Sequence, residues 1–364
     1  MNPTGLNNLV IVLLCGSLFM LAFIVIANPG KVNRKANRWF GAFLLVWATF
    51  WLEEIAAITG FGVLNNYFTE TIHYLQIFLC FFYYLAVSFY INPEYRFRWS
   101  DTKHLVIPAA YLLLRLIQKP DSNNVLLVVL VISQSILYTT ITFLKIRRHQ
   151  KKIGLFSSNK NEIDLRWLEY IIAMLLGSSI LFAAYSLLYN ASAPNLYINS
   201  AQLVAVLFVG YFALKQKEIY PLDQKQRVEL IAFNEEPVPD PKRKIVPDEE
   251  INSLKTRLLA LMEEQKPYLD SNLNLVKLAE QMAVSTHQLS YVINTGFSEN
   301  FFQFINKYRV EKAKELLLNS AKDNYTILGI AFESGFNSKT SFNTTFKKFT
   351  DLTPSEYKKK STGL

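Results

Sequence analysis

The sequence has few of the residues that build disulfide frameworks, metal centres or hydrolytic triads. Among its 364 residues are only 2 cysteines and 4 histidines. Both cysteines, Cys15 and Cys80, lie inside apolar runs, where an isolated thiol behaves as a small apolar side chain. Two isolated thiols provide neither a disulfide scaffold nor a zinc site, so we expect no metal and no cofactor.

The apolar part of the chain also lacks the groups that an intramembrane enzyme or transporter would need. Its aspartates, Asp101, Asp121 and Asp164, fall between apolar runs, whereas an intramembrane aspartyl protease needs facing aspartates within its spans. We find no internal repeat of the kind common in transporters. No catalytic residue is predicted.

What the sequence does contain is long apolar runs, confined to its first part. Hydrophobic residues make up 51% of the chain, and the net charge is +9. Up to about Leu214, apolar runs alternate with short polar breaks; beyond Lys215 the composition is that of a soluble protein. The opening segment "MNPTGLNN" lacks the basic residues of a signal peptide, so we expect the first apolar run to be a retained membrane helix.

About 20 apolar residues cross a hydrocarbon core of about 30 Å, and backbone groups in lipid must bond within their own segment. The runs therefore predict a seven-helix transmembrane bundle in a sensor domain over residues 1–217. The predicted spans are Leu6–Ile26, Trp39–Gly60, Glu70–Ile91, Lys103–Ile117, Val125–Leu144, Trp167–Tyr189 and Leu196–Leu214.

The basic residues of the connecting loops indicate how these spans are oriented. The first, third and fifth loops hold 14 Lys and Arg residues, and the loops on the other side hold 1. Because cytoplasmic loops carry the excess of positive charge, the N-terminus is predicted outside and everything after Lys215 in the cytoplasm. The expected location is the bacterial inner (cytoplasmic) membrane, with several passes.

Residues 218–250 are rich in charge and proline and show no apolar periodicity. Pro237, Pro239, Pro241 and Pro247 crowd this stretch. Such a segment cannot bury enough surface to offset its ordering entropy, so a flexible cytoplasmic linker is predicted. Cleavage in this linker, which would release the C-terminal domain, is a further possibility.

Two segments of residues 251–364 repeat one plan, a short helix, a tight turn and a second helix with a polar outer face. They cover about 275–297 and 326–350. Ser285 followed by Gln288 is a capping-box pattern, Ser338 is the expected cap of the last of these helices, and Thr353 caps one further helix near the C-terminus. Such pairs place their second helix in the major groove of DNA, so two units joined by one long helix predict an all-helical DNA-binding domain.

From about Leu254 to Lys360 the sequence resembles the DNA-binding domain of AraC/XylS-type transcriptional regulators. The second unit and the C-terminal helix match that pattern through Ile330, Ala331, Gly335, Phe336, Ser338, Phe342, Phe346, Lys347, Thr353, Pro354 and Tyr357. The first unit and the joining helix match it through Leu278, Ala279, Ser285, Leu289, Tyr308, Arg309 and Ala313. The resemblance implies a transcriptional regulator, with RNA polymerase as a partner.

Helical spacing and the resemblance point to the same DNA-facing residues. The predicted reading faces consist of His287, Ser290, Tyr291 and Asn294 in the first unit and Lys339, Thr340, Asn343, Thr344 and Lys347 in the second. Two positions depart from the family pattern. Thr344 stands where many relatives have an arginine that reads guanine, and Asp351 stands where glycine is usual at a bend, so a left-handed backbone there would be strained.

Ionisable residues within membrane spans are costly and are functional candidates. At similar depth near the predicted outer side lie five polar residues from three spans, namely Glu53, Glu54, His73, Gln76 and Arg115. They form a candidate signal pocket, with pairing between glutamate and arginine as its simplest chemistry. Interhelical hydrogen bonding near an interface is the alternative role for these side chains.

Together these observations predict a membrane-tethered regulator that couples a signal sensed by its transmembrane domain to promoter binding. A membrane transporter or enzyme with an autoregulatory DNA-binding domain is the alternative function. The expected partners are double-stranded promoter DNA, RNA polymerase, the lipid bilayer, a second copy in a homodimer, and an unknown small-molecule or membrane signal. The sequence does not define the signal, the operator or the direction of regulation.

Overall fold

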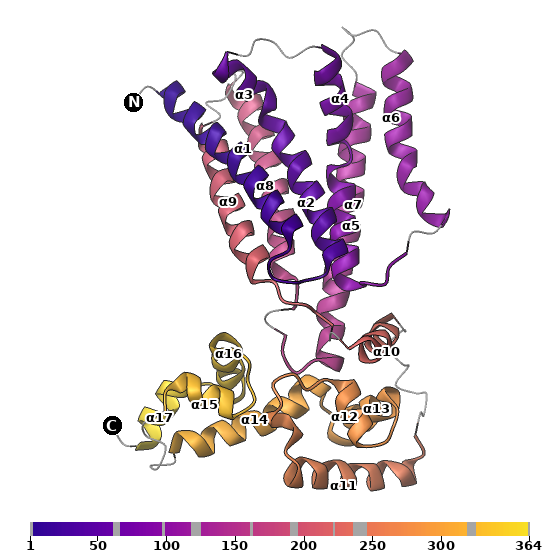
Figure 1. The fold of residues 1–364 in the computed structure, drawn as a ribbon, viewed down its shortest axis with the longest axis vertical. Helices are drawn as coiled ribbons and strands as arrows, with labels where there is room; N and C mark the ends of the chain where they lie inside the picture. The colour runs from indigo at the N-terminus through magenta and orange to yellow at the C-terminus, as the bar shows by residue number, and fades with distance from the viewer. Residues whose placement is uncertain are drawn as a thin grey trace. The chain divides into compact units, whose positions relative to one another are not determined.

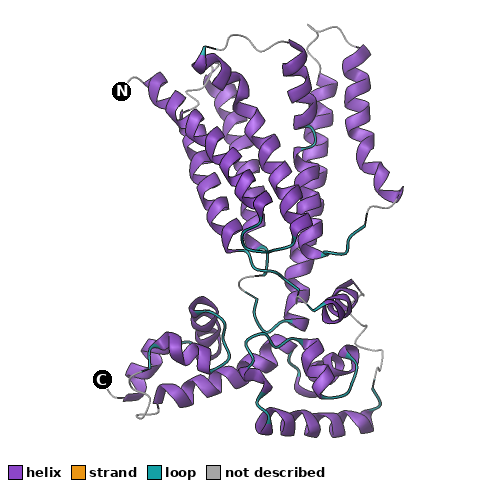
Figure 2. Cartoon of the chain, in the orientation of Figure 1, coloured by secondary structure: helices purple, strands orange, loops and turns teal. Residues whose placement is uncertain are grey.

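The computed structural model describes residues 3–60, 66–96, 99–117, 125–160, 163–189, 196–220, 223–235, 246–318 and 325–362. The chain divides into two compact units. Unit 1 contains residues 1–148 and 165–219, and unit 2 contains residues 149–164 and 220–364. Throughout the described residues the regular elements are helices, accompanied by an isolated bridge between Ser157 and Asn274 (Figure 2). The predicted all-α fold is confirmed.

Unit 1 is built from nearly parallel and antiparallel helices (Figure 1). Its elements are α1 (Pro3–Ala27), α2 (Arg34–Ala48), η1 (Thr49–Trp51), α3 (Leu52–Thr59), α4 (Asn66–Gln76), α5 (Leu79–Ile91), η2 (Trp99–Leu105), α6 (Val106–Ile117), most of α7 (Val125–Phe156), α8 (Arg166–Tyr189) and α9 (Leu196–Lys215). Helix α1 packs against α2 and α9, and α2 packs against α5.

Within the described residues, four helices are long and apolar enough to cross a membrane. They are Thr4–Ala27, Arg34–Thr59, Val129–Phe156 and Leu196–Lys215. A fifth span results if Tyr67–Gln76 and Leu79–Ile91, which meet at a bend of 41°, are taken together. Helix α6 has 12 residues, about 18 Å at the helical rise, which is short of the hydrocarbon thickness. The count of seven spans is therefore not confirmed.

Aromatic side chains fill the interior of unit 1, and apolar side chains also cover much of its outside. Phe40 and Phe43 of α2 are fully buried, and their rings lie 5.3 Å from Trp167 and 5.1 Å from Tyr83, respectively. Many large apolar residues are nevertheless exposed, among them Phe23 with 73% of its surface. A soluble domain rarely leaves so much apolar surface exposed, and lipid would cover it.

Unit 2 is a second helical assembly. It contains the last turns of α7 from His149 onward, α10 (Gln224–Glu235), α11 (Asp248–Glu264), η3 (Pro267–Leu269), α12 (Leu275–Gln281), α13 (Thr286–Phe297), α14 (Phe301–Leu318), α15 (Ile327–Glu333), α16 (Lys339–Thr350) and α17 (Pro354–Thr362). Helix α14 contacts α13 on one side of the assembly and α15, α16 and α17 on the other (Figure 1).

The structure differs from the predicted 218–250 linker at two places, since α11 already begins at Asp248 and a further helix lies within the stretch. Gln224–Glu235 forms helix α10, which packs against α12. Leu230 and Ile231 of α10 are buried in this contact region, with 1% and 6% of their surface exposed. Residues 236–245, which hold three of the four linker prolines, lie outside the described residues.

Candidate nucleic-acid interface

The first helix–turn–helix unit consists of α12 and α13, and its helix starts are capped by side chains. Asn274 Oδ1 accepts the Lys277 N–H at 2.9 Å to begin α12. At the start of α13, Ser285 Oγ accepts the Gln288 N–H at 3.2 Å, and Gln288 Oε1 accepts the Ser285 N–H at 3.0 Å. These bonds satisfy helix N–H groups that have no partner within the helix, and they confirm the predicted capping box.

The second helix–turn–helix unit consists of α15 and α16, and its helix starts are also capped by side chains. Thr326 Oγ1 accepts the Gly329 N–H at 3.0 Å, and Ser338 Oγ accepts the Ser341 N–H at 3.2 Å. The inner face of α16 carries Phe342 and Phe346, both without exposed surface, and the partly buried Phe349. The predicted phenylalanine stripe is therefore core, and it sets which face of α16 points outward.

The predicted reading face of α13 lies opposite a buried row. Leu289, Val292 and Ile293 are buried, with at most 1% of their surface exposed. Asn294, on the other face, is exposed, and its amide donates to Ser290 Oγ at 3.3 Å. Ser290, Tyr291 and His287 are half-buried. The four residues therefore follow one side of α13, as their helical spacing requires.

On α16 the predicted reading face is more open. Lys339, Thr340, Thr344 and Lys347 are exposed, and Asn343 is half-buried. The side-chain oxygen Oδ1 of Asn343 is covered and has no hydrogen-bond partner among the described residues. An asparagine amide can pair with the edge of adenine through two hydrogen bonds. Because this oxygen is covered, the Asn343 side chain has to turn outward before it can pair with a base in this way.

A buried arginine connects the two helix–turn–helix units. Arg309 of α14 has no exposed surface; its Nε donates to Tyr268 O at 2.7 Å and its Nη2 donates to Asp270 O at 2.8 Å. Burial lowers the pKa of Arg309 to about 9, opposed by the nearby Asp270 carboxylate, so the guanidinium stays charged at neutral pH. The arginine thus fixes the segment that precedes α12 onto the helix that leads to the second unit.

The second unit approaches the same segment through a glycine. Gly335 lies in the turn between α15 and α16 with a φ of +85°, where a side chain would be strained. A Cβ at this position would clash with Tyr268 O and come within 2.9 Å of Leu269 Cα. The close approach allowed by Gly335 and the bonds from Arg309 fix the relative position of the two helix–turn–helix units.

Helix α10 touches the reading face of the first unit, a contact that the sequence did not reveal. The ring of Phe233 lies 5.0 Å from the ring of His287. At the other end of α10, Lys225 Nζ is 3.6 Å from Glu280 Oε1, and Gln226 Oε1 accepts from Asn274 Nδ2 at 3.4 Å. One of the predicted base-reading residues, the half-buried His287, is thus in contact with an apolar ring.

The predicted signal-pocket residues of unit 1 are brought together only in part. His73 Nε2 lies 3.5 Å from Glu53 Oε1, and Gln76 Nε2 donates to Thr49 Oγ1 at 3.3 Å. Arg115 forms an ion pair with Glu70, its Nε donating to Glu70 Oε2 at 2.8 Å.

Glu54 is exposed on the first turn of α3. The expected pairing of a glutamate with Arg115 is present, but its glutamate, Glu70, was not among the predicted residues. Glu70 is the first residue of a predicted span, and a polar residue at the end of a span does not by itself indicate a functional site.

Comparisons with known proteins concern the C-terminal part of the chain. A family described as "Helix-turn-helix domain" matches residues 278–360. Uncharacterized HTH-type transcriptional regulators from Staphylococcus aureus strains COL, MSSA476 and N315 are each 35% identical over 91 residues. The match covers 25% of this chain and only 12% of each relative's length. No solved structure matches the chain.

Two capped helix–turn–helix units, joined by one helix and a buried arginine, define a nucleic-acid-binding module. Together with the family match, they identify the C-terminal region as an AraC-type helix–turn–helix DNA-binding domain. In the same chain, unit 1 contributes several membrane-length apolar helices.

Proposed function

We propose that this chain is a membrane-tethered, sequence-specific regulator of transcription. Its seven-span N-terminal domain senses a signal, and its cytoplasmic C-terminal domain binds promoter DNA. The observation that carries the proposal is the presence of membrane-length helices and an AraC-type DNA-binding domain in one chain.

The faces of α13 and α16 support reading of DNA in two successive major grooves. Outward residues on the second helix of such units contact base edges, and the two units of one rigid domain read sites about one helical turn apart. Residues 251–364 hold 15 Lys and Arg against 11 Asp and Glu, a net charge of +4. This modest charge favours weak, salt-sensitive binding to random DNA, so specificity depends on the base contacts.

The positive charges of unit 1 support an N-terminus outside and a C-terminus in the cytoplasm. The ends of α1, α5 and α9 and the start of α2 lie at one end of this unit (Figure 1). The basic residues Lys31, Arg34, Lys35, Arg38 and Lys215 belong to this end. By the positive-inside rule this is the cytoplasmic side of a bacterial inner membrane.

The polar residues at the other side of the unit are the proposed signal site. Glu53 with His73 and Glu70 with Arg115 form two pairs of ionisable groups in a part of the chain dominated by apolar residues. A signal that rearranges such a pair would change helix packing or self-association. A homodimer would raise the local concentration of paired DNA-binding domains, and bound DNA-binding domains would then contact RNA polymerase.

The proposal is tested by substitutions on the reading face of α16. DNA ligands are selected from a random pool by the full-length protein in lipid nanodiscs. Lys339→Ala and Asn343→Ala should each weaken binding to the selected sequence by about 1–3 kcal/mol, because each removes one direct contact. Lys314→Ala on α14 and Asn252→Ala on α11 are the matched controls, since they remove the same groups outside the reading faces. Unchanged affinity and footprint for both α16 variants would refute the assigned face.

A further inference from the structure

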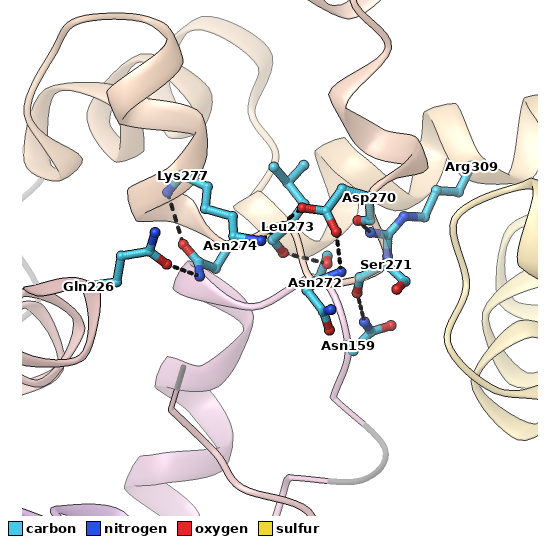
Figure 3. Close-up of polar contacts among 10 residues, drawn as sticks. Asn159, Gln226, Asp270, Ser271, Asn272, Leu273, Asn274, Lys277 and Arg309 are labelled. Atoms are coloured by element: carbon cyan, nitrogen blue, oxygen red, sulfur yellow. Dashed lines mark hydrogen bonds and ion pairs between the residues drawn. The ribbon is translucent and has the colours of Figure 1, made fainter. Parts of the chain in front are cut away.

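The segment that comes after the long helix α7 is folded into the DNA-binding unit. Ser157 forms an antiparallel bridge with Asn274, the cap of α12. Ser158 Oγ donates to Leu273 O at 2.8 Å, and Asn159 Nδ2 donates to Ser271 O at 2.6 Å (Figure 3). Three successive residues are therefore bonded to three of the four residues, 271–274, that lead into the first helix–turn–helix unit.

The same segment is also bonded to the joining helix. Asn306 of α14 is fully buried, and its amide donates to Ser158 O at 2.9 Å as well as to Phe302 O at 2.9 Å. Ser158 itself has 1% of its surface exposed. Buried polar groups of this kind are costly unless they are paired, so these bonds favour the docked position. The oxygens Asn306 Oδ1 and Asn159 Oδ1 are buried without a partner among the described residues.

Apolar and charged contacts hold both ends of the docked segment. On the α7 side, Phe156 is buried and its ring stacks 6.1 Å from that of Tyr220. On the other side, Lys160 Nζ lies 4.3 Å from the centre of the Phe302 ring. A Cβ on Gly154 would clash with Lys160 Nζ, so the lysine side chain packs between Gly154 and Phe302 only because residue 154 is a glycine. Burial, with the nearby Lys348 charge, lowers the pKa of Lys160.

The segment docks on residues 268–274, the junction that positions the two helix–turn–helix units. Residues 268–270, held by Arg309, continue directly into Ser271–Asn274, which the docked segment holds. Asn306 and Arg309 lie on the same helix, α14, less than one turn apart. The bonds from the docked segment and those from Arg309 therefore tie one short stretch of chain to α14 and fix the start of α12 relative to it.

We propose that residues Ser157–Lys160, which follow α7, form a latch through which α7 controls DNA binding. Helix α7 is continuous from Val125 to Phe156, and its last turns belong to unit 2. With the latch docked, the two reading units keep the fixed spacing that simultaneous contact with two major grooves requires. When a change in α7 pulls the latch away, the junction loosens and DNA affinity falls. This inference rests on the proposed function.

The first test removes latch contacts from the full-length protein in nanodiscs and measures binding to the selected DNA. The variants are Ser158→Ala/Asn159→Ala and Lys160→Ala, and Lys151→Ala is the control, because it removes the same charge from an exposed site on α7, outside the latch. If undocking leaves the junction ordered for about a tenth of the time, affinity falls about tenfold. The control should bind as the wild type does. Latch variants that bind DNA as tightly as the wild type would overturn the proposal.

The second test locks the latch with a disulfide. Residues directly opposite in an antiparallel bridge have Cα atoms about 4.5–5.5 Å apart, within the range that a disulfide spans. Ser157→Cys/Asn274→Cys is made in a chain whose free cysteines, Cys15 and Cys80, are replaced by alanine. Because Asn274→Cys also removes the cap of α12, the comparison is between the oxidised and reduced forms of the same chain. Under oxidation the pair should cross-link in nanodiscs, and Ser158→Ala/Asn159→Ala carrying it should bind DNA more tightly than the same chain reduced. Reduction should lower the affinity again.

The two tests separate failure of the latch from failure of the proposed function. If the wild-type protein selects no DNA, the proposed function is wrong, and cross-linking still reports whether the segment docks. If the wild type binds DNA but the cysteine pair does not cross-link although both thiols react with a small alkylating reagent, the docked latch is refuted. Cross-linking without any rescue of affinity would equally refute its control of DNA binding.

Discussion

Two residues of the second helix–turn–helix unit adopt the left-handed backbone, and they differ in what this costs. Gly335 has a φ of +85° and no side chain to clash. Asp351, at the end of α16, has a φ of +60°, and its N–H donates to Lys347 O at 2.8 Å to close the helix. For a residue with a Cβ this conformation costs about 1–2 kcal/mol, although aspartate tolerates it better than most. The left-handed backbone foreseen for Asp351 is thus present.

Asp351→Gly should therefore stabilise unit 2 by about 1 kcal/mol, because glycine adopts this conformation without steric cost. Asp351→Ala should lower stability, since alanine keeps the Cβ and loses the polar group. The measurement is proteolysis of the membrane-embedded protein across a urea series, followed through a tag at the C-terminus. A glycine variant no more resistant than the wild type would mean that Asp351 bears no strain.

Arg309 shows where inference from sequence fails at the residue scale. It was recognised as part of a family pattern on the joining helix, but nothing in its spacing indicates that it is fully buried. Its two carbonyl partners, Tyr268 and Asp270, lie 41 and 39 residues away. Asp270 has a lowered pKa, because hydrogen bonds from Lys277 Nζ and from the Asn272 N–H outweigh the opposing effect of its burial. Such contacts exist only once η3 and α14 have packed.

At the scale of elements, helices with local signals were predicted well and docked segments were not. Helices α12 and α13 fall within the predicted 275–297, and α15 and α16 within 326–350, since caps and apolar spacing encode them locally. Helix α10 lies in a charged stretch without periodicity. The latch offers only serine, asparagine and lysine, which look like an ordinary loop until their partners at 271–274 and 306 are known.

Helix α10 leads to a prediction about the free state of the first reading face. Because Phe233 packs on the half-buried His287, we expect DNA to displace this ring when His287 contacts a base. An aromatic pair contributes about 0.5–1.5 kcal/mol, so Phe233→Ala should tighten DNA binding by about two- to tenfold. Fluorescence anisotropy with the selected DNA measures this change.

Val228→Ala is the matched control for that experiment. Val228 lies on the same helix with 52% of its surface exposed, and its loss should leave the affinity unchanged. If Phe233→Ala binds DNA no more tightly than this control, α10 does not compete with DNA for His287. The position of α10 would then have to affect binding in another way or not at all.

At the scale of the whole molecule, an odd or even number of membrane spans decides whether the two chain ends lie on opposite sides of the membrane. An even number, such as the four long apolar helices of the described residues, places both chain ends on the same side of the membrane. Five spans, with the bent pair taken as one, or the seven predicted from sequence, place them on opposite sides. The loop charges, 14 against 1, favour an odd number with the C-terminus inside.

We therefore expect protease added to intact spheroplasts to remove a tag at the N-terminus and to leave a tag at the C-terminus untouched. After lysis the protease should remove both tags, which shows that the C-terminal tag was shielded and not resistant. Removal of both tags from intact spheroplasts would place the DNA-binding domain outside the cell, where no promoter is available, and would exclude the proposed function. Protection of both tags would show an even number of spans with the DNA-binding domain still inside. Regulation of transcription would then survive, but the charge-based orientation of α1 would be wrong.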